Sequence, residues 1–176
     1  MDEPLDAAAD GPDATDAREA LRTFHADHGA TFVEEGGVEV VDDYGNRERT
    51  HRAVRNGVGV TQAPYDVAVL EGSDRHEYLN NVVTNRVPTV EGEGCYALLC
   101  DPQGRIEVDM YVYDAGERLL VLLPPGTARE VVDGWETFIQ DVEIRVATDA
   151  FAVFGVHGPT ATEKVEDDIS VQLGLQ

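Results

Sequence analysis

The sequence predicts an α+β domain built from a mixed, largely antiparallel sheet with packed helices. Segments with the period of strands and segments with the period of helices follow one another irregularly, unlike the regular alternation of a parallel α/β fold. Several of the expected strands are joined by short turns, which connect antiparallel neighbours. Hydrophobic residues make up 42% of the 176-residue chain, so a core can form and global disorder is excluded.

The first half of the chain is expected to hold helices and strands behind a disordered acidic tail. In order, these are the tail over residues 1–15, a helix over 16–28, a hairpin of strands over 31–35 and 38–41, a helix over 44–56, and strands over 58–61 and 66–70. Gly29 and Gly57 can end the two helices, and Gly36-Gly37 supplies the hairpin turn. The tail is rich in Asp, Ala and Pro and has little to bury.

Residues 16–176 are expected to form one domain, whose second half begins with a helix from residue 73. The remaining elements are strands over 95–100, 105–113 and 118–123, an amphipathic helix over 127–140 with Val131, Trp135 and Phe138 inward, strands over 142–147 and 151–156, and a last helix that opens at Gly158-Pro159. Residues 101–104 read Asp-Pro-Gln-Gly, which favours a tight turn between two strands.

The chain is strongly acidic, with 13 Lys and Arg against 35 Asp and Glu and a net charge of −22. Such a chain repels phosphate backbones and anionic lipid headgroups, so we expect neither nucleic acid nor a membrane as a partner. The acids are spread through the whole sequence, and Lys164 is the only lysine. This pattern favours the surface of a halophilic protein over an acidic tail that binds a basic partner.

The N-terminal sequence and the histidines argue against a secreted, a membrane-spanning or a metal-binding protein. The chain begins with the acidic sequence Met1-Asp2-Glu3, whereas a signal peptide begins with basic residues. No apolar run approaches the roughly 18–20 residues that span a bilayer. We therefore expect a cytoplasmic protein. His25, His28 and His51 lack the supporting thiols and acids of a metal site, so none is expected. Dinucleotide-binding, Walker, zinc-protease and nucleophile-elbow motifs are absent, and these patterns leave the function open.

A set of short motifs occurs in a fixed order along residues 20–165. They include His25-x-x-x-Gly29-Ala30, Gly72-x-Asp74-Arg75, Tyr78-Leu79-Asn80, Thr84-Asn85, Gly94-Cys95-Tyr96, Asp101-x-x-Gly104-Arg105, Asp109-x-x-x-Tyr113 and Gly158-Pro159-Thr160. In this order they resemble the N-terminal part of the glycine cleavage T-protein family. Its members are tetrahydrofolate-dependent aminomethyltransferases, and the family includes YgfZ-type folate-binding proteins.

The resemblance implies a folate site. Asp109 matches the family's catalytic aspartate, which lies against the folate nitrogen that receives the one-carbon unit. Tyr96 and Tyr113 match tyrosines that flank the pterin ring, although strand tyrosines that simply pack a core have the same pattern. Thr84 and Asn85 match a turn near the cofactor, and a loop stabilised by Asn85 is the structural alternative.

Two departures separate this sequence from the T-protein pattern. The family's C-terminal half, which supplies an arginine and a glutamate around the folate, has no counterpart here. The family's Asp-Val-Ser-His-Met stretch is replaced by Gly59-Val60-Thr61-Gln62-Ala63-Pro64. Two folate-dependent functions therefore stay open, with a salt-adapted binding domain that has lost folate as the third alternative. The first is aminomethyl transfer from a lipoyl-carrying protein to tetrahydrofolate. The second is a YgfZ-type role, in which folate is bound and iron–sulfur enzymes are assisted without transfer.

Overall fold

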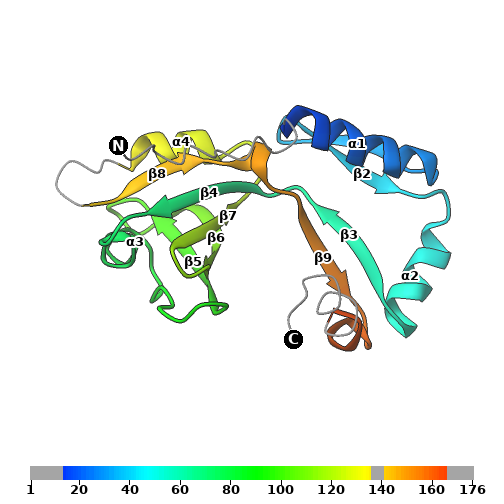
Figure 1. Ribbon diagram of the computed structural model, residues 1–176. Coiled ribbons are helices and arrows are strands. Elements are labelled where there is room, and N and C mark those ends of the chain that lie inside the picture. Colours follow the sequence, from blue (N-terminus) through cyan, green and yellow to red (C-terminus); the bar gives the residue numbers. More distant parts are fainter. Residues whose placement is uncertain (1–13, 136–140, 166–176) are drawn as a thin grey trace, which may run out of the picture.

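The computed structural model describes residues 14–135 and 141–165. Figure 1 shows a five-stranded sheet with helices packed on it at one end of the molecule, and a two-stranded ribbon beside a hairpin and further helices at the other. Most of the expected tail over 1–15 lies outside the described ranges, and so does Phe138. The first helix already begins at Ala14, two residues before the expected start.

The expected helices and strands are all present in the described ranges, with ends displaced by a few residues. The helices are α1 (Ala14–Asp27), α2 (Arg47–Asn56), α3 (Arg75–Val82) and α4 (Ala128–Gly134), with a 3-10 turn at Thr148–Ala150. The strands are β1 (Thr31–Glu35), β2 (Val38–Asp43), β3 (Gly59–Ala63), β4 (Asp66–Glu71), β5 (Gly94–Cys100), β6 (Ile106–Asp114), β7 (Arg118–Leu123), β8 (Glu143–Val146) and β9 (Val153–His157). Residues 161–165 begin the last expected helix.

The described strands pair antiparallel throughout. The five-stranded sheet has the order β5-β6-β7-β4-β8. β1 pairs with β2 in the hairpin, and β3 pairs with β9 in the ribbon. The α+β class with a largely antiparallel sheet is therefore confirmed.

One face of the five-stranded sheet forms the core under α3 and α4. Leu79 of α3, Val131 of α4 and Trp135 at the C-terminal end of α4 belong to one buried cluster, as the helical spacing predicted for Val131 and Trp135. The sheet contributes a row of side chains to the same cluster: Ala68, Leu70, Ala97, Met110, Val112, Leu119, Val121 and Leu123. Each fully buried leucine or valine among them contributes roughly 1.5–3 kcal/mol. The main core therefore lies between this face and the two helices, while Val67 and Val69 of β4 are buried on the opposite face.

The hairpin turn packs against the loop that leads into α4. Gly36 has a φ of +57°, and a Cβ at this position would lie 2.4 Å from the Pro125 carbonyl oxygen. Any larger residue would strain the backbone and push the two loops apart. This contact joins the α1 and β1–β2 part of the chain to the five-stranded sheet.

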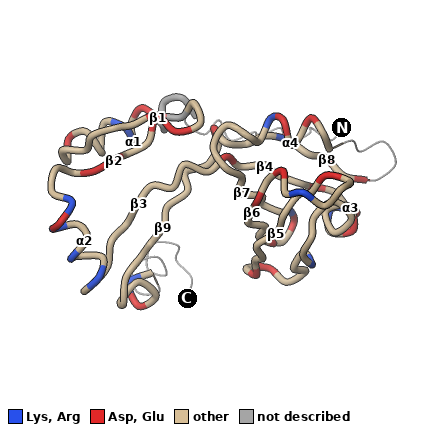
Figure 2. The backbone as a smooth tube through the Cα atoms, turned by 180° about the vertical axis from the view of Figure 1, so that it is seen from behind, with Lys and Arg blue, Asp and Glu red and all other residues tan. Residues whose placement is uncertain are grey.

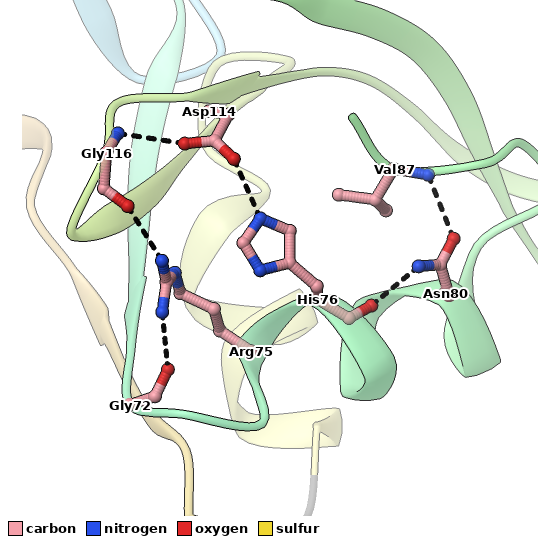
Figure 3. A network of polar contacts seen from close by, with 7 residues as sticks. All are labelled: Gly72, Arg75, His76, Asn80, Val87, Asp114 and Gly116. Carbon is pink, nitrogen blue, oxygen red and sulfur yellow. Dashed lines mark hydrogen bonds and ion pairs between the residues drawn. The ribbon is translucent and has the colours of Figure 1, made fainter. Parts of the chain in front are cut away.

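A polar network fixes α3 to the turn between β6 and β7, as Figure 3 shows. His76 Nε2 donates to Asp114 Oδ2 at 2.8 Å, and the Gly116 amide donates to Asp114 Oδ1 at 2.8 Å. Arg75 donates to the carbonyls of Gly72 and Gly116. Burial of Asp114, which is 4% exposed, acts to raise the pKa of its carboxyl, but the hydrogen bonds from His76 and Gly116 and the charges of His76 and Arg75 outweigh it and lower the pKa.

Acidic residues occur on most elements of the surface, whereas arginines gather on α2 (Figure 2). The ion pairs of α2 are exposed, including Arg47 with Asp42 and Asp43 and Arg52 with Glu48, so each contributes little to stability. Among the described residues, no helix is long and apolar enough to cross a membrane.

Candidate functional site

The face of the sheet opposite α3 and α4 carries four tyrosines and one carboxylate, which we call the tyrosine face. Antiparallel register places Tyr96 of β5 opposite Tyr111 of β6, Gly94 opposite Tyr113, and Leu98 opposite Asp109. Directly opposed residues point to the same side of a sheet. Tyr65, which precedes β4, completes the face, because its ring contacts the ring of Tyr111.

Asp109 and Tyr96 form a hydrogen-bonded pair on this face. The Tyr96 hydroxyl donates to Asp109 Oδ2 at 3.0 Å. This hydrogen bond, assisted by the charge of Asp109, raises the pKa of Tyr96, so the hydroxyl stays protonated at neutral pH. Among the described residues, no other group hydrogen-bonds to the Asp109 side chain, which leaves Oδ1 able to accept from a ligand.

Tyr113 lies over Gly94 of the neighbouring strand. A Cβ added to Gly94 would be 2.5 Å from the Tyr113 ring, so the ring occupies the space that a side chain would take. Tyr96, Tyr111 and Tyr113 are 48%, 37% and 40% exposed. Rings of this size in a sheet interior would be far more buried, and their exposure makes them available for stacking on a flat ligand.

Thr84 and Asn85 lie along the outer edge of β5. The Thr84 hydroxyl accepts a hydrogen bond from the Leu98 backbone amide at 3.1 Å, and the Thr84 backbone amide donates to the Leu98 carbonyl. The Asn85 amide nitrogen donates to the Tyr96 carbonyl at 3.0 Å. Both side chains thus stabilise the edge of the strand that carries Tyr96, in keeping with the structural alternative for Asn85.

Tyr65 and Tyr111 were not among the site residues expected from the sequence. Tyr111 could have been found, since it lies two residues from both Asp109 and Tyr113 and alternation places it on the same face. Tyr65 gives no local signal, because it reaches this face only through the pairing of β4 with β7 and of β7 with β6.

A cleft of about 600 Å³ lies elsewhere, between α1, the hairpin and residues 148–153. Tyr65 and the buried His25 line it, but none of the expected site residues does. His25 Nδ1 lies 2.7 Å from the Tyr44 hydroxyl, which fits a structural role. In the described ranges, no group of three or more His, Cys, Asp or Glu residues is arranged to hold a metal ion.

Comparisons with known proteins agree with the resemblance in the sequence. Residues 21–172 match the family described as GCVT N-terminal domain. The aminomethyltransferase of Corynebacterium jeikeium is 29% identical over 149 residues, covering 82% of this chain and 38% of the relative. A probable aminomethyltransferase of Pyrococcus horikoshii is 27% identical over 167 residues, covering 85% of this chain and 40% of the relative.

A solved structure has the same fold. The crystal structure of glycine cleavage system aminomethyltransferase T from Bartonella henselae superimposes with a TM-score of 0.73 at 19% identity, over 84% of this chain and 42% of that protein. The chain thus spans about two fifths of the length of these relatives. Because the family match covers most of the sequence, the chain belongs to the GCVT N-terminal domain family.

Proposed function

We propose that this chain binds tetrahydrofolate on the tyrosine face and takes part in aminomethyl transfer of the glycine cleavage type. The observation that carries this proposal is the Asp109–Tyr96 pair, set among exposed aromatic rings on the sheet face opposite α3 and α4. Family membership and the resemblance of Asp109 to the family's catalytic aspartate support the same assignment.

The chemistry of the tyrosine face fits a folate. Its pterin and aminobenzoyl rings are flat and can stack on Tyr96, Tyr111 and Tyr113. Its ring nitrogens carry hydrogens that a carboxylate oxygen can accept, and Asp109 Oδ1 is available for this contact. Tetrahydrofolate supplies the nitrogens that take up the one-carbon unit.

In this proposal Asp109 is the catalytic residue and Tyr96 positions it. The Asp109 carboxylate accepts a hydrogen bond from the folate nitrogen, orients that nitrogen and helps to manage its proton as the transfer proceeds. The Tyr96 hydroxyl holds Oδ2 and thereby directs Oδ1 toward the ligand. The aminomethyl group arrives on a sulfur of a lipoyl-carrying protein. Its carbon forms bonds to two folate nitrogens as its bonds to sulfur and to the amino nitrogen break, so methylenetetrahydrofolate forms, the lipoyl sulfur leaves as a thiol, and ammonia leaves; the two protons lost by the folate nitrogens go to the sulfur and the ammonia.

A YgfZ-type role is the second candidate. It is favoured by the absence of the Ser-His-Met sequence, since the corresponding segment here forms β3 and ends in Gln62-Ala63-Pro64. Folate binding is common to both candidates, and the transfer step separates them.

The test of the proposed function is a titration with tetrahydrofolate, followed by saturation-transfer NMR so that affinities down to millimolar are detected. Binding is expected, with the strongest transfer to protons of the pterin and aminobenzoyl rings. Absence of binding at millimolar ligand would overturn the proposal. A second assay supplies tetrahydrofolate and an aminomethyl-loaded lipoyl carrier protein, and formation of methylenetetrahydrofolate selects the aminomethyltransferase over the YgfZ-type role.

A further inference from the structure

Helix α2 carries a concentration of arginines on a molecule that is otherwise acidic (Figure 2). Four of the 13 Lys and Arg residues of the chain lie in its ten residues, together with a single acid, Glu48. Arg49, Arg52 and Arg55 recur every third residue, so they lie along one side of the helix, and all three are exposed. Arg52 pairs with Glu48, whereas neither Arg49 nor Arg55 forms an ion pair with another described residue. Two guanidinium groups are therefore able to pair with carboxylates from outside the chain.

A groove of about 350 Å³ lies beside this row of arginines, between α2, the end of β2 and β3. Val41 and Val60 give it apolar surface, and Val60 is 60% exposed. Arg47 and His51 line its α2 side, and His51 lies one helical turn before Arg55. The groove and the arginine row therefore form one continuous surface, which we call the α2 surface.

The carboxylates in the groove determine where an occupant can place its charges. Asp42 and Asp43 both line the groove, and both are paired with Arg47. A single arginine offsets only one of these two charges, so the groove itself disfavours a further carboxylate. An occupant therefore places its acidic side chains on the arginine row and an apolar side chain against Val60.

We propose that the α2 surface docks an acidic segment of a partner protein, in which carboxylates flank an apolar side chain. The planar guanidinium of arginine matches a carboxylate in a bidentate pair, and an apolar side chain fills the groove. A nucleic acid fits less well, because the net charge of −22 repels a long phosphate backbone and the apolar groove gives it no contact. A short acidic segment needs only the charges within the screening length, about 8 Å at 0.15 M salt. The surface lies on α2 and β3, away from the five-stranded sheet that carries the proposed folate site (Figure 1).

The test measures fluorescence polarisation of two labelled peptides with the full chain: Glu-Asp-Leu-Glu-Asp, and the same peptide with Ser in place of Leu. The wild type is expected to bind the leucine peptide more tightly than the serine peptide. The double variant Arg49→Gln/Arg55→Gln is expected to weaken binding of both peptides about 2- to 25-fold, the range for loss of two exposed ion pairs. Val60→Ser is expected to weaken the leucine peptide about 2- to 10-fold, because apolar contact is lost, and to leave the serine peptide within twofold of the wild type.

Arg86→Gln/Arg129→Gln is the matched control, because it makes the same change in net charge at two exposed arginines outside α2. Val146→Ser is the control for Val60→Ser, since Val146 is an exposed valine (40%) on β8. Both controls are expected to bind the peptides as the wild type does, and melting temperatures report whether each variant is folded.

Three results would overturn the proposal: no binding of the leucine peptide at millimolar concentration, equal weakening in the double variant and its control, or tighter binding of a short inorganic polyphosphate than of the peptide. Self-association of the wild type that Arg49→Gln/Arg55→Gln abolishes, measured by analytical ultracentrifugation, would also overturn it, because a second copy would then be the occupant. Tetrahydrofolate binding is expected to be unchanged in these variants, so the folate proposal stands or fails separately.

Discussion

The Tyr96 hydroxyl and the Asp109 carboxylate are joined across two neighbouring strands by a 3.0 Å hydrogen bond. The two residues are not directly opposed, since Tyr96 pairs with Tyr111 and Asp109 with Leu98. A long side chain is needed to reach along this diagonal, and tyrosine places its hydroxyl at the required distance from β5. Tyr96 is exposed and Asp109 is partly exposed, so the bond contributes little to the stability of the fold, and in the proposed function it orients the carboxylate.

Tyr96→Phe is therefore expected to lower aminomethyl transfer more than folate binding. The phenyl ring still stacks, but Asp109 loses the donor that holds Oδ2. Transfer should fall about 2- to 10-fold, as expected for loss of one hydrogen bond, while the affinity for tetrahydrofolate changes by less than twofold. Steady-state kinetics and titrations of the two proteins measure both quantities, and an equal loss of affinity and rate would argue against positioning.

Asp109→Asn tests the catalytic assignment. Asparagine is nearly isosteric, so the fold and the melting temperature should be retained, but it has no negative charge and no useful basicity. Transfer is expected to fall by about 10²–10⁴, the range for a removed acid–base group. Tetrahydrofolate affinity should fall much less, because the stacking contacts remain. A variant that transfers at the wild-type rate would make Asp109 an ordinary surface carboxylate.

Gly94→Ala tests the position of Tyr113. The new Cβ would lie 2.5 Å from the Tyr113 ring, so the ring must move off the strand. Binding of tetrahydrofolate is expected to weaken, because the displaced ring can no longer stack on the ligand in the proposed site. Gly92→Ala serves as a control at the same turn, since a Cβ there meets nothing within 4 Å, although its φ of +86° costs some stability. Unchanged tetrahydrofolate binding in Gly94→Ala would remove Tyr113 from the proposed site.

Much of the fold could be predicted from local sequence, and the features that could not be predicted have a physical cause in common. The Gly36-Gly37 turn and the strands on either side of residues 101–104 depend on neighbouring residues and on alternation, so they were predicted correctly. The strand order and the contribution of Tyr65 depend on long-range pairing, which no local pattern encodes. The start of α1 was placed two residues late, because helix ends are set by weak local preferences.

Asp114→Asn is expected to destabilise the protein in a pH-dependent way. The pKa of Asp114 is lower in the folded protein than in the unfolded chain, so its contribution is present above the unfolded pKa of about 4 and is lost as pH falls through the folded value. At pH 6 the free energy of unfolding should be about 1–3 kcal/mol lower than in the wild type, the cost of an impaired buried hydrogen-bond network. The difference from the wild type should shrink below about pH 4.

Denaturant unfolding at several pH values measures this difference. Asp133→Asn, at an exposed carboxylate on α4, is the control and should show little effect at any pH. A constant difference between wild type and Asp114→Asn from pH 6 to pH 3 would show that the charge of Asp114 makes no contribution.

Salt dependence tests the halophilic interpretation of the surface. With a net charge of −22, the carboxylates of the surface repel one another in dilute buffer. The screening length falls from about 10 Å at 0.1 M to about 3 Å at 1 M salt. The melting temperature is therefore expected to rise between 0.1 and 3 M KCl, and a gain of 2 kcal/mol corresponds to about 4–8 °C for a domain of this size. A variant with glutamine at the exposed Glu34, Glu35, Glu107 and Glu117 should melt higher than the wild type at 0.1 M and respond less to added salt. A wild-type melting temperature that stays flat across this range would remove the halophilic interpretation, because self-repulsion would then be too weak to have shaped the surface.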